Sequence, residues 1–148
     1  MATTVRYSHG LYFCSDLESG RVSCDAFSDK GKEYPSAPEL LMVSLGSCIG
    51  AVLLTYADRH NINYEGLEIS LDWDIVEHPH RIGRIAITVH MPGPLTQQQV
   101  EILERVAEQC LIHNTLLHAP EIKLDLQVMK PTGAADAPSE RKPKERKQ

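Results

Sequence analysis

The sequence predicts an α+β domain in which antiparallel strands surround a long, buried central helix. One observation is an uncharged, apolar run of 18 residues at 40–57, which is too long for a strand. A second is the strict alternation of apolar and polar residues at 67–75, with the apolar positions repeated at Ile85, Ile87, Val89 and Met91, which is typical of half-buried strands. A third is an apolar stripe at helical spacing within 96–111. Strands and helices in this order favour an α+β arrangement.

The N-terminal part predicts a pair of strands before the long helix. These strands are residues 5–14 and 20–27, joined by a loop at 15–19. Cys14 and Cys24 lie equally far from the end of that loop, so they can face each other across the two strands. We interpret both as ordinary strand residues, and a second redox pair is the alternative.

The run at 40–57 predicts the central helix of the core. Ser36 can cap this helix, and Glu39, three residues later, can reach back to it as a capping box. A helix that is apolar on nearly every side must be surrounded by protein. Gly46 and Gly50 would let a neighbouring helix or sheet approach closely. The run is long enough for a membrane span, but its polar and small residues, the cap and the absence of a flanking basic cluster predict no membrane association.

The second half of the chain predicts a hairpin, a helix and a last strand. The two alternating segments form the antiparallel hairpin, with a loop at 77–83. Thr96 and Gln99 then supply a second capping box, which opens the helix at 96–111. Cys110 falls on the apolar, buried side of that helix. The last strand has apolar residues that face one way: Ile122, Leu124, Leu126 and Val128.

Length and charge predict one domain at 1–130 and a disordered, charged tail at 131–148. The chain has 148 residues, of which 42% are hydrophobic, and this suits a single core. The tail holds five basic and three acidic residues, so the total formal charge of −5 leaves −7 for the body. An acidic body without a basic, aromatic stripe predicts no nucleic-acid binding. The alternative for the tail is contact with an anionic partner through its basic end.

The four cysteines are predicted to be reduced thiols in a cytoplasm. Residues 1–10 contain no apolar core segment or cleavage pattern of an export signal. The chain has no Cys-x-x-Cys motif for zinc binding or thioredoxin-type chemistry. A thiol on an apolar helix face is usually an inert, small hydrophobic group, but Cys48 and Cys110 could form a reversible disulfide if the fold brings them together.

Two motifs resemble those of the OsmC/Ohr family of peroxide-reducing proteins. Residues 35–48, PSAPELLMVSLGSC, resemble the opening of that family's central helix. Residues 110–116, CLIHNTL, resemble its second cysteine motif, Cys-Pro-Val-His-x-Thr-Leu. The order of strands and helices also matches, and the resemblance covers roughly residues 5–129.

The resemblance implies an OsmC-like fold and an intertwined homodimer with active sites at the subunit interface. It implies that Cys48 is the peroxidatic cysteine and Cys110 the resolving one. The Cys48 thiolate would attack a small-molecule hydroperoxide and become a sulfenic acid, which Cys110 would convert to a disulfide. An external thiol reductant would reopen the disulfide. We expect no cofactor.

The sequence departs from the Ohr-like pattern at one position. That pattern has a catalytic Glu ten residues before the first cysteine, where this chain has Pro38. Glu39 matches the OsmC-like branch and is our third candidate catalytic residue, although its capping role alone explains it. The Ohr-like pattern also uses an N-terminal Arg to steady the thiolate, and the nearby candidate is Arg21.

Histidines raise the question of a metal. His113 and the two motif cysteines could supply three zinc ligands, but a histidine near a helix end can simply interact with exposed carbonyls. His78 and His80 could bind metal weakly, and a solvated loop is the alternative that we favour. We predict no metal site.

Two functions are consistent with the sequence. We favour a thiol-dependent peroxidase that reduces organic hydroperoxides or hydrogen peroxide through a Cys48 sulfenic acid and a Cys48–Cys110 disulfide. The alternative is a non-enzymatic OsmC-like module that binds a small apolar ligand or senses oxidants. Pro38, in place of the Ohr-like Glu, favours the alternative.

Overall fold

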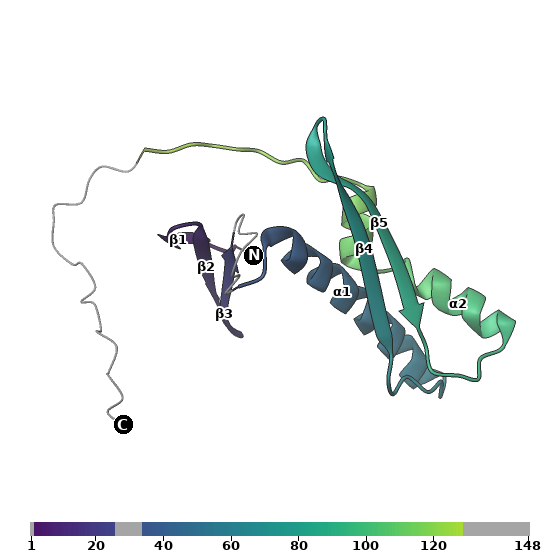
Figure 1. Ribbon diagram of the computed structural model, residues 1–148. Helices are drawn as coiled ribbons and strands as arrows, with labels where there is room; N and C mark the ends of the chain where they lie inside the picture. The colour runs from purple at the N-terminus through teal and green to yellow at the C-terminus, as the bar shows by residue number, and fades with distance from the viewer. Residues whose placement is uncertain (1, 26–33, 129–148) are drawn as a thin grey trace, which may run out of the picture.

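The structure, a computed structural model, describes residues 2–25 and 34–128. Three short strands precede a long helix, and a hairpin and two further helices follow (Figure 1). The elements in chain order are β1 (Arg6–His9), β2 (Tyr12–Leu17), β3 (Gly20–Asp25), α1 (Ala37–Arg59), β4 (Glu68–Glu77), β5 (His80–His90), α2 (Gln97–Ala107) and α3 (Leu111–Leu117). The β4–β5 hairpin lies along α1, and α2 and α3 also pack against α1. The predicted tail, at 131–148, lies outside the described residues.

The N-terminal sheet has three strands in the order β1-β2-β3, all antiparallel, rather than the predicted two. The predicted first strand is split because Gly10 adopts a φ of +52°, a left-handed conformation that reverses the chain. The predicted loop at 15–19 is also too long, since β2 continues to Leu17 and pairs it with Gly20. The sheet is therefore a small meander beside the start of α1.

The predicted capping box of α1 is present. The Ser36 backbone N–H donates to Glu39 Oε2 at 2.7 Å, and the Glu39 backbone N–H donates to Ser36 Oγ at 3.4 Å. Pro38 lies in the first turn, where a missing N–H costs no helical hydrogen bond. These contacts start the helix at the predicted position and hold Glu39 at its end.

The two glycines of α1 lie against β4, as predicted. A Cβ added to Gly46 would stand 3.0 Å from Leu71 Cδ1, and one added to Gly50 would stand 3.5 Å from Ile69 Cδ1. The core cluster extends from this contact through α1 to α2 and consists of Leu45, Ile49, Leu53, Leu103 and Cys110. The absence of side chains at the glycines thus lets α1 pack closely on the sheet.

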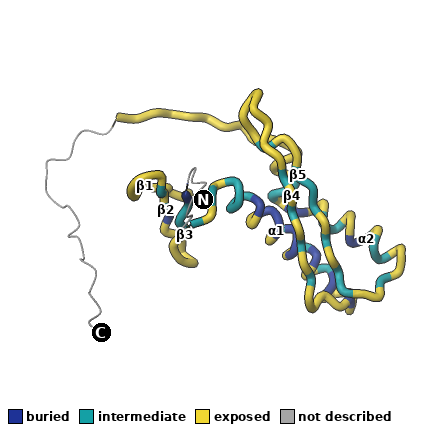
Figure 2. Tube along the Cα trace, viewed as in Figure 1, coloured by how far each residue is buried: buried dark blue, intermediate teal, exposed yellow. Residues whose placement is uncertain are grey.

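Only one side of α1 is covered by its own chain, which differs from the predicted fully buried helix. α1 is long and apolar enough to cross a membrane, yet 39% of its most apolar window is buried. Val43 is 62% exposed and Leu54 is 39% exposed on the bare side. Figure 2 shows that buried and exposed segments alternate along the helix. An apolar helix face of this length has no covering element among the described residues.

The predicted β4–β5 hairpin is confirmed, with paired residues from Glu68 opposite His90 to Glu77 opposite His80. The connection is shorter than the predicted loop at 77–83, because only His78 and Pro79 lie between the strands. Ile69, Leu71, Ile85, Ile87 and Val89 pack against the core from this hairpin. The hairpin therefore supplies one wall of the core.

The second predicted helix is interrupted before Cys110. Its capping box forms, since Thr96 N–H donates to Gln99 Oε1 at 2.9 Å. However, α2 ends at Ala107, and its last carbonyls close a turn in which the Cys110 N–H donates to Ala107 O at 3.2 Å. Cys110 is buried as predicted, but it caps the separate helix α3 rather than lying on α2.

The predicted last strand is not formed within the chain. Residues 119–128 have no strand pairing in the structure (Figure 1). Their alternating apolar side chains are between 82% and 95% exposed, namely Ile122, Leu124, Leu126 and Val128. A strand needs a neighbouring backbone to satisfy its N–H and C=O groups, and this segment runs away from the β4–β5 hairpin (Figure 2).

Candidate functional site

The fold brings Cys48 and Cys110 together. Cys48 lies in the middle of α1 and is partly buried, whereas Cys110 is fully buried at the start of α3. Both are free thiols, and Cys48 packs against the core cluster that contains Cys110. Hydrogen bonding between the two side chains contributes to the pKa shift of each. The two cysteines are therefore neighbours because α3 packs on α1.

The first turn of α3 surrounds both sulfur atoms with backbone donors. Cys110 is the N-cap residue, and its Sγ accepts a hydrogen bond from the His113 N–H at 3.4 Å. Hydrogen bonding from the Ile112 and Leu111 backbone lowers the pKa of Cys48. The first N–H groups of a helix have no partner within the helix, so they are available to a thiolate that lies beside the helix N-terminus.

These contacts move the two thiol pKa values in opposite directions. The hydrogen bond from Cys110 and the Ile112 and Leu111 amides lower the pKa of Cys48, although burial opposes them. Burial, followed by the neighbouring Cys48, raises the pKa of Cys110. The pair titrates as a coupled system in which the first proton leaves Cys48 and the remaining proton stays on Cys110. The directions of the two shifts make Cys48 the more readily ionised thiol of the pair.

A pH profile of alkylation tests this assignment. The thiolate is the reactive form, and an ordinary thiol has a pKa of about 8.5. Because the pKa of Cys48 is lowered, its iodoacetamide labelling should reach half its maximal rate below that pH and decline as the pH falls further. Cys24 is an internal comparison, since burial and then Asp25 raise its pKa. Peptide mass spectrometry measures both midpoints, and a Cys48 midpoint at or above that of Cys24 would contradict the assignment.

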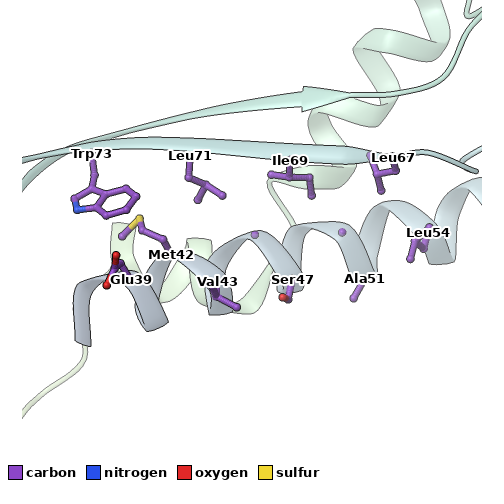
Figure 3. A pocket seen from close by; sticks show the side chains of 12 residues that line it. Glu39, Met42, Val43, Ser47, Ala51, Leu54, Leu67, Ile69, Leu71 and Trp73 are labelled. Atoms are coloured by element: carbon purple, nitrogen blue, oxygen red, sulfur yellow. The ribbon is translucent and has the colours of Figure 1, made fainter. Parts of the chain in front are cut away.

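The structure places Glu39 away from the cysteine pair. Nine residues separate Glu39 from Cys48, which corresponds to about 13.5 Å along the helix and half a turn around it. Glu39 holds the α1 cap and borders the groove of Figure 3, where it lies near Met42 and Trp73. The capping role is thus present, and the structure does not bring this carboxylate to either thiol.

Arg21 lies in the N-terminal sheet and is engaged by an acidic partner. Its Nε donates to Asp16 Oδ1 at 2.8 Å and its second nitrogen donates to Asp16 Oδ2 at 3.4 Å. Its side chain is largely exposed, beside Cys14 rather than Cys48. Within one chain, the groups that lower the pKa of Cys48 are therefore a thiol and two backbone amides, and not this guanidinium.

Cys14 and Cys24 do not face each other. In the β2–β3 register, Cys14 lies opposite Ser23, and Cys24 lies opposite Phe13. Side chains that pair across strands share a face, and successive side chains alternate, so the two thiols lie on opposite faces of the sheet. The alternative of a second redox pair within one chain is wrong.

The histidines make no metal site in the described parts of the chain, where no three His, Cys, Asp or Glu side chains gather in a way that could hold an ion. His80 Nδ1 lies 3.3 Å from Glu77 Oε2 at the exposed hairpin tip. His113 Nδ1 is buried without a hydrogen-bond partner among the described residues, so the expected contact with a carbonyl does not form. The main contribution of His113 to the site is its backbone N–H.

Two cavities lie on either side of α1. The first, about 640 Å³, is an apolar groove between the bare side of α1 and β4, lined by Val43, Ser47, Leu54, Ile69, Leu71 and Trp73 among others (Figure 3). The second, about 650 Å³, lies between α1, β5 and α2. Its lining includes Ile49, which follows Cys48, and His113, which contacts Cys110. Neither sulfur atom lines either cavity.

The sequence-based prediction of one helix at 96–111 missed the short helix α3 and the backbone N–H groups at its start. Two signals favoured a break: the Asn114 side chain can donate to carbonyl groups at a helix end, and CLIHNTL begins with a residue whose sulfur can cap a helix. The break matters because it turns three backbone N–H groups toward the cysteines.

Fold and site together define an α+β domain with a hydrogen-bonded thiol pair, one thiol on a central helix and the other at the start of a short helix. The sequence profile described as OsmC-like protein matches residues 29–125. The chain belongs to the OsmC-like protein family, as the two motifs predicted. Within this fold α1 supplies three residues of the core cluster, Leu45, Ile49 and Leu53. Among curated proteins, none matches the sequence.

Solved structures share the fold at low sequence identity. The OsmC-like protein of Mycoplasma pneumoniae superimposes with a TM-score of 0.72 at 15% identity, covering 80% of this chain and 87% of the other. The organic hydroperoxide resistance protein OsmC of Legionella pneumophila gives 0.61 at 18%, covering 78% and 89%. The organic hydroperoxide resistance protein OhrB of Bacillus subtilis gives 0.59 at 18%, covering 86% and 98%. These similarities confirm the predicted OsmC-like α+β fold.

Proposed function

We propose that this protein is a cysteine-based reductase of organic hydroperoxides or hydrogen peroxide. The observation that carries the proposal is the hydrogen-bonded Cys48–Cys110 pair, in which the pKa of Cys48 is lowered and that of Cys110 is raised. A peroxidatic cysteine has to be a thiolate, and a resolving cysteine has to be close enough to form a disulfide with it. Two family structures named as organic hydroperoxide resistance proteins support the choice of substrate class.

The reaction proceeds in two steps through the thiols of the chain. The Cys48 thiolate attacks the terminal peroxide oxygen, so that an S–O bond forms, the O–O bond breaks, and an alkoxide or hydroxide leaves and takes up a proton. The Cys110 sulfur then attacks the resulting sulfenic acid, forming the S–S bond and releasing water. The two thiols thereby supply two electrons to the peroxide. An external thiol reductant returns them by thiol–disulfide exchange.

The neighbouring cavity supports an organic substrate. The space of about 650 Å³ between α1, β5 and α2 is large enough for a small apolar molecule. Its lining from Leu53, Met91 and Leu95 is apolar, and it reaches the residues next to both cysteines. The cavity is our candidate site for the organic group of the hydroperoxide.

Steady-state turnover tests the proposed activity. The reduced protein, supplied with dithiothreitol, should consume cumene hydroperoxide or hydrogen peroxide over many turnovers. The matched control is the double variant C14S/C24S, which keeps the proposed pair and should retain the full rate. No consumption above the rate of the dithiol alone would contradict the enzyme and favour an OsmC-like module that binds a ligand or senses oxidants.

We also propose that the protein functions as a homodimer in the cytoplasm. The bare side of α1, the exposed apolar face of the N-terminal sheet around Phe13 and Val22, and the unpaired segment 119–128 are all apolar surfaces that one chain leaves uncovered. A second copy of the chain presents the same surfaces and can cover them reciprocally, as symmetric dimers do. Free thiols are consistent with a cytoplasmic location.

A charge on the unpaired segment should disrupt this dimer. L126K places an ammonium on the apolar side of residues 119–128, where burial in a dimer would be costly, and should weaken association at least about tenfold. Q127K adds the same charge to the polar side and is the matched control. Sedimentation measures the mass, which should be twice 16.5 kDa for the wild-type protein and fall toward 16.5 kDa for L126K only. A wild-type monomer would contradict the dimer.

A further inference from the structure

The side chain of Asn114 joins the end of α2 to the start of α3. Its Nδ2 donates to Glu108 O at 2.8 Å and to Cys110 O at 3.0 Å. Both partners are carbonyl oxygens, so both bonds require the amide nitrogen. The two hydrogens of that one nitrogen therefore hold the turn at 108–110 from a position on the following helix.

The donors that lower the pKa of Cys48 lie at the last residue of this turn and at the two residues that follow it. These donors are Cys110 Sγ and the N–H groups of Leu111 and Ile112. α1 carries no charged residue between positions 40 and 57, so its neighbouring side chains offer no alternative cation to Cys48. The direction in which the three donors point is thus set by the turn that Asn114 holds.

We propose that Asn114 is a positioning residue for Cys48, which acts by fixing the turn at 108–110 so that the first donors of α3 stay directed at the Cys48 sulfur. The inference rests on the proposed function and deepens it. The Ohr-like pattern has a catalytic Glu where this chain has Pro38, and the positioned donors of α3 would activate Cys48 in place of that Glu. Asn114 is not itself a donor to the sulfur. It acts through two carbonyl groups and the residues that follow them.

The neighbouring residue Thr115 makes a side-chain hydrogen bond that stays within α3. Its Oγ1 donates to Leu111 O at 2.8 Å, one turn earlier in the same helix. This bond does not join α3 to α2, and an α-helix keeps its backbone bonds without it. Thr115 is therefore the matched control position on α3.

The test compares N114A, N114D and T115A in the full chain. N114A removes both donors, and N114D keeps the shape of the side chain but presents a carboxylate to the two carbonyl oxygens. Glu108 and His113, the titratable groups on the same connection, are unchanged in all three variants. The readout is the pH profile of Cys48 alkylation by iodoacetamide, mapped by peptide mass spectrometry.

We expect N114A to slow Cys48 labelling at pH 7 by about fivefold and to move the half-maximal pH upward, since tenfold corresponds to one pKa unit. N114D should have a larger effect, because it adds a negative charge near the thiolate. T115A should label within about twofold of the wild-type rate. Wild-type profiles for both Asn114 variants would overturn the proposal. If N114A does not fold, an unshifted N114D profile still overturns the proposal, because a carboxylate cannot donate to either carbonyl oxygen.

Labelling does not depend on peroxide reduction, so the two proposals can fail separately. A wild-type protein without turnover, but with a Cys48 profile that shifts in N114A and not in T115A, would overturn the peroxidase and support the positioning role. Full turnover together with unshifted Asn114 variants would support the peroxidase and overturn the positioning role. Thermal melting of each variant identifies effects that come from lost folding alone.

Discussion

Replacing Cys48 by serine is expected to remove peroxide reduction, with kcat/KM lowered by about three orders of magnitude or more, as for the loss of other catalytic nucleophiles. A serine hydroxyl is almost entirely protonated near neutral pH, and the donors of α3 cannot lower its pKa enough to make it a nucleophile toward peroxide. The exchange is nearly isosteric and should leave fold and mass unchanged. Peroxide consumption with dithiothreitol as reductant measures the effect.

The control for this variant is C14S, which removes a thiol from the N-terminal sheet. Cys14 lies on β2 beside Arg21, and it is not among the groups that shift the pKa of either Cys48 or Cys110. C14S should therefore retain wild-type turnover. Retained activity in C48S would assign the chemistry to another thiol and would contradict the proposed role of Cys48.

Replacing Cys110 is expected to stop the reaction after a single turnover. Without this thiol the Cys48 sulfenic acid cannot form the internal disulfide, so the protein should consume about one equivalent of peroxide rapidly and then stall. C110S keeps a hydroxyl donor toward Cys48, whereas C110A removes it. Both variants should therefore stall, but only C110A should raise the pKa of Cys48, because the Cys110 hydrogen bond is the largest cause of its lowering.

Stopped-flow measurement of the first turnover separates the two effects. C110A should react more slowly than C110S at neutral pH, and the difference should disappear at high pH, where Cys48 is ionised in both variants. Continued turnover of C110S would show that Cys110 is not required for resolution. Equal first-turnover rates of the two variants at neutral pH would show that Cys110 does not activate Cys48.

Capping motifs and residue alternation correctly predicted the helices and strands that form through contacts close in the sequence. The capping boxes at Ser36 and Thr96 start α1 and α2 at the positions expected from the sequence. Alternating residues predicted the β4–β5 hairpin, since each strand finds its partner across a two-residue connection. The two motif cysteines were also correctly expected to meet, because the resemblance supplied the long-range information that periodicity lacks.

Features that depend on distant contacts could not be predicted in this way. The alternation at Ile122–Val128 correctly indicates an amphipathic segment, but it cannot say whether its own chain offers a strand edge to pair with. The apolar run of α1 predicts burial, but it does not indicate whether each side is covered by the same chain or by another one. The residue that follows the end of α2, Glu108, accepts a hydrogen bond from the side chain of Asn114, which lies seven residues beyond Ala107.

The candidate site differs from the sequence-based hypothesis chiefly in what activates Cys48. Sequence patterns directed attention to a carboxylate or a guanidinium, and the nearest candidates were Glu39 and Arg21. The structure uses Glu39 in the α1 cap and pairs Arg21 with Asp16. Activation by Cys110 and the first N–H groups of α3 requires no charged side chain, so Pro38 does not by itself exclude a reactive thiolate.

The most direct test of the central claim is mass spectrometry of the reduced, full-length protein after one equivalent of cumene hydroperoxide. We expect a rapid loss of two hydrogens per chain and, after digestion without reductant, one linked peptide pair that contains Cys48 and Cys110. An unchanged mass, or a disulfide that contains Cys14 or Cys24 instead, would contradict the claim that Cys48 and Cys110 form the reactive pair.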